Sequence, residues 1–404
     1  MLYYEWKKIW AKQGTKIAML VIACTFVIVC WFAIRNVFWV NENGDNEYGI
    51  TAAHKLRDAK KEWAGELTEE VIAKVIAENR RINETEEGRS EDIRLSDIAY
   101  GWKQGFHDIR NMLVWSFCKF REGDYYKPDS LVPEDAVHFY ENRLLHLQEW
   151  LADEGQYVYS EDEREFLIER YAALQTPFQY DYEDGWKQIF ELAATISMIM
   201  MLALSFVVAG IFAGEFSYKA DAIFFSSYHG RKKAVAAKLG AGLLFITSVY
   251  FAVMFLYTIV MLVILGADGA DLIIQTHDWK SYYLLTNIQE YWLIILGGYI
   301  GTLFCLVLTM LVSALTKSKA LSAAVPFALL FLPGFVGTSR IAVKATGLLP
   351  DRLLDIAQEI TTFRLYHIGG KVVASFYIIF PLYMVLSVVL CPMIYQIFRK
   401  KEAG

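Results

Sequence analysis

Charged residues and histidine are absent from six long apolar stretches of this 404-residue sequence. The stretches are 17–34, 192–213, 239–265, 291–315, 320–337 and 372–397. Each is long enough to be interpreted as a membrane-spanning helix. Carriers driven by a proton or sodium gradient usually keep ionisable groups at mid-membrane depth, where such groups are costly and functional. Their absence predicts that the energy for transport is supplied from outside the spans, or that the protein only conducts its substrate passively. The alternative is a pathway lined only by Ser, Thr, Tyr and backbone carbonyls, without ionisable groups.

The sequence also lacks the motifs of a nucleotide-binding or catalytic chain. No G-x-x-x-x-G-K-[ST] occurs, which excludes ATP hydrolysis by a P-loop of this chain. His138 and His146 share a predicted helix with Glu141, Glu149 and Asp153, but a solvated helix face explains them better than a metal site. No nucleophile elbow is found. We therefore expect no catalytic residue, no metal site and no cofactor in this chain, and we expect that it is not an enzyme.

Cysteine is scarce, with five residues in the whole chain. Four of them, Cys24, Cys30, Cys305 and Cys391, lie in the apolar stretches, where a thiol behaves as a small apolar group. Cys118 is the one cysteine between the first and second stretches, which excludes an internal disulfide there. An outward-facing domain without a disulfide suits a bacterial surface better than a disulfide-rich secreted fold.

What is abundant is apolar and aromatic surface, with 55% hydrophobic and 15% aromatic residues, more than an ordinary soluble domain has. The charge is divided unevenly along the chain. Residues 41–186 hold 33 acidic and 17 basic residues, whereas the remainder holds 12 acidic and 22 basic residues. This acidic segment would attract cations or cationic peptides by long-range steering, although it serves equally well to keep a domain soluble.

Basic residues outside that segment form four clusters. They are Lys7, Lys8, Lys12 and Lys16; Lys219, Arg231, Lys232, Lys233 and Lys238; Lys317 and Lys319; and Arg399, Lys400 and Lys401. All four fall on one side if the N-terminus is cytoplasmic and all six stretches cross the membrane, which satisfies the positive-inside rule. We therefore predict a multi-pass protein of a bacterial cell membrane with cytoplasmic N- and C-termini.

The predicted fold class is an all-α integral membrane protein with six transmembrane helices and a mainly helical extracellular domain inserted between the first two. The predicted spans are 17–40, 189–213, 238–265, 291–315, 320–338 and 372–397. The predicted cytoplasmic parts are an amphipathic helix at 1–16, a loop at 214–237, a turn at 316–319 and a tail at 398–404. The predicted extracellular parts are the domain at 41–186, a loop at 266–290 and an interfacial helical region at 339–371.

Local patterns support this layout. No small-x-small cleavage site follows the first stretch, so we interpret it as an uncleaved anchor. Helical spacing predicts helices at 51–63, 67–83, 92–119, 134–151 and 165–174, the last after a capping box formed by Ser160 and Glu163. Residues 177–182 are expected to be extended, and 351–361 to form an amphipathic helix. Pro326 and Pro333 interrupt the fifth stretch and make it the weakest span.

The loop between the second and third spans is unusually aromatic for a solvent-exposed turn. It places Glu215, Lys219 and Asp221 among apolar side chains and ends in the run Arg231 to Lys233. The apolar residues are Phe216, Tyr218, Ile223, Phe224 and Phe225. This pattern predicts an amphipathic face that presses against another protein on the cytoplasmic side.

Residues 214–227 and 231–238 resemble the inner loop of ABC-2-type (type V exporter-like) ABC transporter permease subunits. In that family a Glu closes the second span, and a short coupling helix and a basic residue precede the third span. The amphipathic N-terminal helix and the six spans match as well. A large outer domain between the first two spans resembles the bacterial subset that includes antimicrobial-peptide resistance exporters.

The resemblance implies an ATPase-coupling site formed by Glu215, Phe216, Lys219, Ala220, Asp221, Ile223, Phe224 and Arg231. Glu215 would hold the loop at the membrane boundary. Phe216, Ala220, Ile223 and Phe224 would fill a groove on an ATPase subunit, with Lys219 and Asp221 paired at its rim. Two alternatives remain: an interfacial helix that places its aromatics among lipid headgroups, and basic residues that act only as topology anchors.

The resemblance further implies a permease that works with two ATPase subunits, which hold ATP and Mg, and with a second permease subunit in a homodimer or heterodimer. Membrane lipid is an expected partner and nucleic acid is not. An apolar, Met-rich pathway favours an amphipathic substrate, such as an antimicrobial peptide or a lipid-like molecule. The candidate pathway residues are Met198, Met201, Ser205, Tyr299 and Thr302. The alternatives are a membrane-anchored sensor or assembly protein with a ligand-binding outer domain, and a stand-alone carrier or channel.

Overall fold

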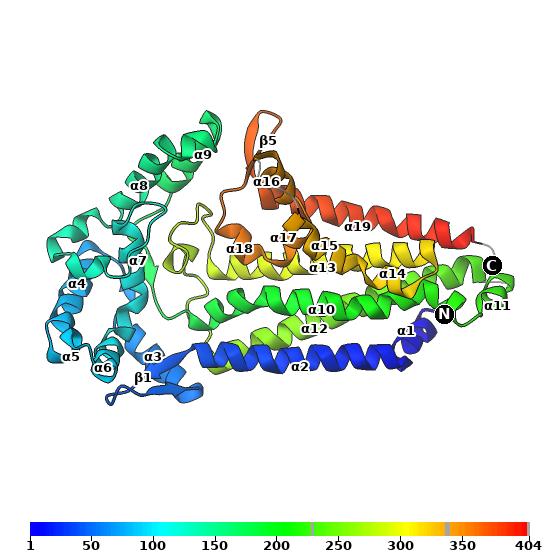
Figure 1. Cartoon of the computed structure of the whole chain (residues 1–404), viewed down its shortest axis with the longest axis horizontal. Coiled ribbons are helices and arrows are strands. Elements are labelled where there is room, and N and C mark those ends of the chain that lie inside the picture. The colour runs from blue at the N-terminus through cyan, green and yellow to red at the C-terminus, as the bar shows by residue number, and fades with distance from the viewer. Residues whose placement is uncertain (228–229, 336–339, 402–404) are drawn as a thin grey trace.

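The computed structural model of the chain describes residues 1–227, 230–335 and 340–401. The molecule is elongated and mostly helical, with long helices running along its longest axis (Figure 1). Residues 37–183, which we call the inserted region, gather mainly at one end, the domain end (Figure 1). Helix α1 (Leu2–Ala11) and the end of the last helix lie at the opposite end, which we call the terminal end.

Five helices of the described residues are long and apolar enough to cross a membrane. They are α2 (Gln13–Asn36), α10 (Asp184–Ser217), α12 (Val235–Leu265, after a π-helical turn from Gly230), α13 (Asn287–Thr316) and α19 (Ser375–Arg399). Large apolar side chains are exposed along the outermost of them, such as Val27 of α2 and Val388 of α19. Such faces suit a lipid environment better than water. The predicted helical fold is confirmed, and the chain is consistent with an integral membrane protein.

Helix α10 is the central helix of the bundle. Its 34 residues span about 50 Å, which exceeds the roughly 30 Å of a hydrocarbon core. It packs against α2, α12 and α13, and Met200, Leu204 and Val208 of its middle are buried. At its first turn a Cβ on Gly185 would lie 2.1 Å from the carbonyl oxygen of Gly266, so only glycine fits there. One continuous helix therefore joins the domain end to the terminal end.

The fifth predicted span, 320–338, does not form one long helix within the described residues. Helices α14 (Lys319–Ala323) and α15 (Val325–Phe331) make a shorter apolar segment, and a 3-10 turn at Leu332–Phe335 follows. Proline lacks a backbone N–H and clashes with the preceding turn, and Pro326 and Pro333 lie at these two breaks. Residues 336–338 lie outside the described part of the chain, so a sixth span stays a prediction.

The inserted region is built mainly from helices. Some of them pack around a core of their own, whereas the helices at 50–61, 141–152 and 161–172 contribute buried residues to the core of the helix bundle. The helices are α3 (Ile50–Lys61), α4 (Glu69–Asn83), α5 (Glu86–Arg89), α6 (Ile93–Lys103), α7 (His107–Phe117), α8 (Glu141–Ala152) and α9 (Glu161–Ala172). The capping box before α9 is confirmed, because Ser160 Oγ accepts from the N–H of Glu163 and Glu163 accepts from the N–H of Ser160. Ile72, Ile76, Ile109 and Leu113 belong to the buried core.

Three two-stranded antiparallel sheets occur among the described residues. They pair β1 (Phe38–Val40) with β2 (Asn46–Tyr48), β3 (Gly65–Glu66) with β4 (Gln179–Tyr180), and β5 (Leu365–Ile368) with β6 (Lys371–Ala374). The second pair brings the two ends of the inserted region together, and β4 lies in the segment predicted to be extended. Residues 38–40 and 372–374 were predicted to belong to membrane spans, but the structure places them in strands instead.

Three predicted helices are interrupted in the structure. The helix predicted at 92–119 is divided into α6 and α7 by a 3-10 turn at Gln104–Phe106. The segment predicted as one helix at 134–151 begins as a 3-10 helix (Pro133–His138), and α8 starts only at Glu141. The amphipathic helix predicted at 351–361 is divided into α17 (Asp351–Leu354) and α18 (Ile356–Ile360). The break lies at Asp355, which leaves helical geometry and accepts a hydrogen bond from the N–H of Gln358. This side chain caps a new helix and thereby stops the preceding one.

The inserted region is fixed to the loop between α12 and α13 by buried contacts. The guanidinium of Arg143 donates to the carbonyl oxygens of Trp279 (3.0 Å) and Ser281 (2.7 Å) and lies over the ring of Tyr171. Trp279 itself belongs to the core of the inserted region. A buried cation needs such partners, because an unpaired polar group costs free energy in an apolar interior. The inserted region and the helix bundle therefore pack as one body.

Candidate functional site

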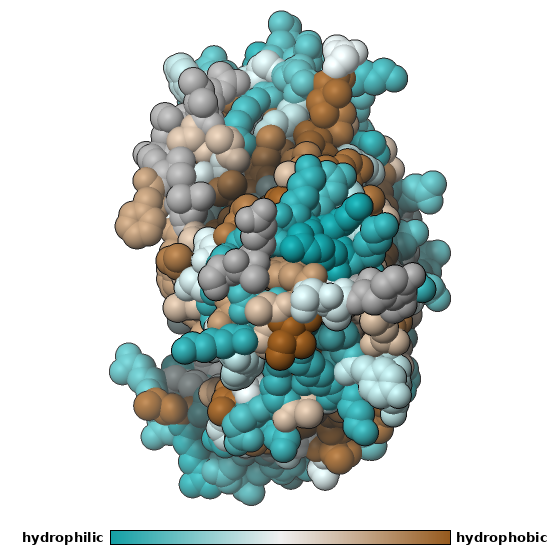
Figure 2. Space-filling view, turned by 90° about the vertical axis from the view of Figure 1, so that its right-hand side faces the viewer, coloured by the Kyte–Doolittle hydropathy of each residue, from teal (hydrophilic) through white to brown (hydrophobic). Residues whose placement is uncertain are grey.

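The loop between α10 and α12 lies at the terminal end and is the first candidate site (Figure 1). Helix α10 continues past the predicted span to Ser217, and a short helix, α11 (Asp221–Ser226), follows. The turn between them needs Lys219 in the left-handed region, with φ of 55°. Figure 2 looks onto this end of the molecule, where hydrophilic residues surround separate hydrophobic patches. The sequence thus folds into the short helix expected between the two long helices.

The apolar residues of this loop do not all face outward. Ile223 of α11 is 75% exposed and Tyr218 is 69% exposed. Phe216 and Phe224 are half-buried against the ring of Phe398 near the end of α19, with ring centroids 6.1 and 5.8 Å from it. The prediction that both rings fill a partner's groove therefore needs correction. They attach α11 to the bundle, and Ile223 is the exposed apolar contact of α11.

The charged residues of the loop also differ from the expected arrangement. Asp221 is buried and Lys219 is exposed, so the two do not form a pair at an open rim. Ala220 is half-buried at the start of α11. Arg231 is exposed, but its Nε donates to the carbonyl oxygen of Phe225 at 3.3 Å and its guanidinium lies over that ring. The side chain therefore caps the C-terminal end of α11 as well as carrying a positive charge.

Glu215 is the buried centre of a charge cluster that joins three elements. Its Oε1 accepts from Lys238 Nζ of α12 at 2.6 Å and from Lys8 Nζ of α1 at 2.8 Å. Lys238 also contacts Glu5 of α1 at 3.2 Å. We call Glu5, Lys8, Glu215 and Lys238 the terminal-end cluster. This geometry fits the role expected of a glutamate that closes the second long helix.

Helix α1 lies against the bundle beside this cluster. Ile9 is buried, and the rings of Trp6 and Trp10 pack edge-on against Phe245 of α12. Lys12 Nζ donates to the carbonyl oxygen of Gly210 at 3.3 Å, and burial lowers the pKa of Lys12 to about 8. The tryptophans thus make protein contacts in addition to any contact with lipid headgroups.

The candidate pathway residues lie within the packing of this single chain. Met201, Ser205 and Thr302 are buried, whereas Met198 and Tyr299 are half-buried. Ser205 Oγ donates to the carbonyl oxygen of Leu202 at 2.7 Å, and Tyr299 shares a 2.8 Å hydrogen bond with Thr247. Three of the five therefore do not face open space in this conformation.

A second charge cluster, which sequence analysis missed, lies at the domain end of α10. Lys60 of α3 contacts Asp108 of α7 at 2.8 Å and Asp184 of α10 at 2.7 Å. Lys187 contacts Asp108 at 3.1 Å and Glu183 at 3.3 Å. Although burial opposes its charge, the carboxylates of Asp108 and Asp184 raise the pKa of Lys60. These contacts tie the inserted region directly to the start of the central helix.

The same cluster extends to the loop before α13. His277 lies 3.5 Å from Glu183 and 3.2 Å from Glu290, and Asn287 donates to Glu183 at 2.6 Å. Burial opposes the charged form of His277, but the two carboxylates outweigh it and raise its pKa to about 10. Despite its own burial, Glu183 has a pKa lowered to about 2 by Lys187 and His277. We call Lys60, Asp108, Glu183, Asp184, Lys187, His277 and Glu290 the domain-end cluster.

A signal for this cluster was present in the sequence but did not specify its partners. Glu183, Asp184 and Lys187 stand directly before the second apolar stretch, where charges commonly mark a membrane boundary. Lys60 and Asp108 are two among the many charges of the inserted region. Only the fold brings these charged groups together. The composition therefore identified the charged segment but not the contacts within the domain-end cluster.

Comparisons with models of protein families, with curated proteins and with solved structures yield no match to this chain. The site must therefore be interpreted from its own geometry. Among the described residues no group of three or more His, Cys, Asp or Glu side chains has the arrangement to hold a metal ion.

Proposed function

We propose that this chain is the permease subunit of an ATP-driven ABC exporter and that α11 is its contact with a separate ATPase subunit. The observation that carries the proposal is the exposure of Ile223 on a short helix that is itself fixed to the bundle. A partner that presses on α11 moves a packed element and not a loose loop. Glu215, at the end of α10, links that movement to α1 and α12.

The complete assembly follows from this proposal. Two ATPase subunits supply ATP and Mg, and a second permease subunit completes a homodimer or heterodimer. Residues 320–338 provide the sixth crossing, both termini lie in the cytoplasm of a bacterium, and the inserted region is extracellular. The pathway forms between the two permease copies, and an amphipathic peptide or lipid-like molecule is its substrate. ATP-driven closure of the ATPase pair shifts α11 and changes the packing of the long helices.

Capture of an ATPase chain tests the proposal. The full chain is co-expressed with an ABC ATPase encoded beside its gene, and the ATPase that co-purifies is measured. Ile223→Asp places a charge in the proposed contact, and capture is expected to fall at least about tenfold, since central apolar contacts dominate such interfaces. Ile93→Asp is the matched control, because Ile93 of α6 is 78% exposed at the opposite end of the molecule.

Two results would contradict the proposal. The first is a wild-type chain that captures no ABC ATPase under conditions in which it is inserted and folded. The second is undiminished capture by Ile223→Asp, which would remove α11 from the interface. A loss of capture in both variants would indicate a general defect, so equal membrane insertion and equal thermal unfolding of the two variants are required.

A further inference from the structure

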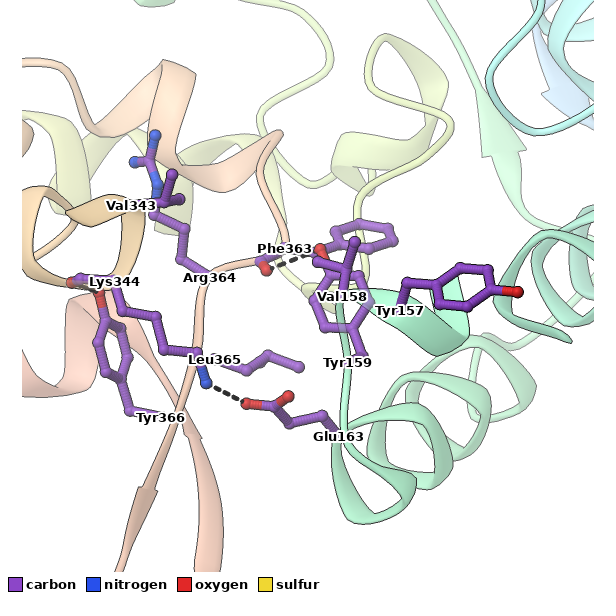
Figure 3. Close-up of a pocket in the computed structure, with 10 residues that line it drawn as sticks. All are labelled: Tyr157, Val158, Tyr159, Glu163, Val343, Lys344, Phe363, Arg364, Leu365 and Tyr366. Atoms are coloured by element: carbon purple, nitrogen blue, oxygen red, sulfur yellow. Dashed lines mark hydrogen bonds and ion pairs between the residues drawn. The ribbon is translucent and has the colours of Figure 1, made fainter. Parts of the chain in front are cut away.

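A cavity of about 320 Å³ lies where the inserted region meets the segment before α19 (Figure 3). Three parts of the chain line it: residues 157–163 around the start of α9, residues 343–344 of α16 (Arg340–Thr346), and residues 363–366 at the start of β5. The volume falls at the lower end of the range of about 300–1,000 Å³ typical of ligand sites. The cavity belongs to neither charge cluster described above.

Most of the wall is apolar or aromatic. Val158 and Val343 are both 48% exposed, and the rings of Tyr159 and Phe363 lie close together in the cavity wall (Figure 3). Leu365 contributes buried aliphatic surface. Apolar walls with a few polar groups are the usual composition of sites that bind small amphipathic molecules.

The polar groups of the wall are held in place by hydrogen bonds within the chain. Tyr159 donates to the carbonyl oxygen of Phe363 at 3.1 Å, and Tyr366 donates to the carbonyl oxygen of Lys344 at 2.7 Å. Lys344 Nζ contacts Glu163 at 2.7 Å (Figure 3). Because the wall is held by these bonds, the cavity is formed before any ligand enters it.

The groups of the described wall that can still form a hydrogen bond with a ligand are mostly donors. Glu163 is nearly inaccessible and already accepts from Lys344 and from the N–H of Ser160. Arg364 pairs with Glu359 outside the lining. An ammonium carries three N–H groups and a guanidinium five, so Lys344 and Arg364 keep donors after these pairs. Among the described lining residues, Lys344 and Arg364 are thus the cations and Glu163 is the carboxylate, and each of the three is already in an ion pair.

We propose that this cavity binds an amphiphile whose apolar chain lies along Val158, Val343 and Phe363 and whose anionic head faces the ammonium of Lys344, with the guanidinium of Arg364 as a second cation of the wall, directed toward Glu359. The head is a carboxylate or a phosphate, the two anions that these cations recognise in proteins. The bound molecule contacts both the inserted region and the segment before α19, so it holds the two together. This site does not depend on an ATPase partner, and binding persists even if the proposed permease function is wrong.

Photo-crosslinking of the purified full chain in a neutral maltoside detergent tests the site. The probe is dodecanoic acid with a terminal diazirine, and mass spectrometry locates the adduct. Adducts are expected on residues 157–163, 343–344 or 363–366. Dodecyl phosphate and unlabelled dodecanoic acid are expected to compete, and their relative strength identifies a phosphate or a carboxylate as the preferred head. Dodecanol and dodecyltrimethylammonium are expected to compete at least about tenfold less well.

Cavity-filling variants provide the matched comparison. Val158→Trp and Val343→Trp, singly and together, are expected to lower the adduct yield, at least about tenfold for the double variant. Val137→Trp is the control, because Val137 is 53% exposed on the 3-10 helix Pro133–His138, which does not line the cavity. Lys344→Gln tests the head group, since glutamine keeps a donor for Glu163 but removes the charge that favours an anion over dodecanol.

Four results would overturn the proposal. Adducts found only outside the three lining segments would remove the site. Equal competition by dodecyltrimethylammonium would show that the wall does not select an anion. An unchanged adduct yield in folded Val158→Trp and Val343→Trp chains, verified by thermal unfolding, would show that the cavity is not occupied. Competition by inorganic phosphate alone would replace the amphiphile with a free anion and would equally refute the proposed chain contacts.

Discussion

The two ends of α10 carry charge clusters that differ in burial and in the number of elements they join. At the domain end, Lys60 and Glu183 are almost inaccessible, and five separate elements contribute charged groups. At the terminal end, Glu215 and Lys238 are buried, but Lys8 has a side chain that is 48% exposed. The side chains of the first cluster are at most 20% exposed, whereas the second is open on the side of α1.

This difference assigns different mechanical roles to the two ends. Breaking a buried pair leaves an uncompensated charge and costs about 3–5 kcal/mol, whereas an exposed pair contributes about 0–1 kcal/mol. The domain-end cluster therefore fixes the inserted region to α10. At the terminal end, the Lys8–Glu215 ion pair costs less to break, although Ile9, Trp6 and Trp10 also hold α1 against the bundle. Such an arrangement suits a helix that receives force at one end only.

The largest effect is expected from Lys60→Met, which removes the closest cation of Asp108 and Asp184 and leaves them only the longer contacts to Lys187. The free energy of unfolding should fall by about 3–5 kcal/mol, as for other broken buried pairs. Thermal unfolding of the detergent-solubilised chain measures the change. Arg81→Met is the control, because the Arg81–Glu78 pair is exposed and within one helix, and its loss should be nearly neutral. An equally stable Lys60→Met chain would contradict the enclosed nature of the cluster.

A smaller effect is expected from pH acting on His277. Its pKa is raised from 6.5 to about 10 in the folded chain, so the stabilisation is complete below pH 6.5 and is lost as pH rises through about 10. Wild-type stability minus that of His277→Gln should therefore decline across this window. Lys12 has a lowered pKa, which favours the folded state as pH rises above about 8 and so opposes the effect of His277. Because Lys12 is present in both chains, its contribution cancels when the stability of the variant is subtracted from that of the wild type. A difference that is constant with pH would contradict a charged His277.

The long helices could be predicted because membrane crossing imposes a length and a composition that are local properties of sequence. Uncharged runs located α2, α10, α12, α13 and α19, and the helix ends lie within a few residues of the predicted spans. The broken segment 319–335 was marked in advance by Pro326 and Pro333. Asp355 was not recognised as a cap, because an aspartate inside an amphipathic pattern looks like one more surface charge.

The candidate site was predictable only in part for a similar reason. The short helix α11 and the position of Glu215 followed from local pattern, whereas the partners of Glu215 lie 207 positions earlier and 23 positions later. Phe216 and Phe224 were expected to face a partner because no local signal indicates that Phe398 covers them. Long-range packing decides which aromatic residues of an amphipathic segment remain exposed, and a single sequence does not encode that directly.

The smallest effect is expected at Lys8, and it distinguishes the open cluster from the enclosed one. Lys8→Gln removes an ion pair whose lysine is half exposed, so the free energy of unfolding should change by no more than about 1 kcal/mol. Glu215→Gln at the same contact should cost more, about 1–3 kcal/mol, because Lys238 then keeps only Glu5 as a charged partner among the described residues. Denaturant unfolding of both variants measures the two losses of unfolding free energy. Equal losses would show that the half-exposed Lys8 contributes as much as the buried Glu215, which would contradict an open side of the terminal-end cluster.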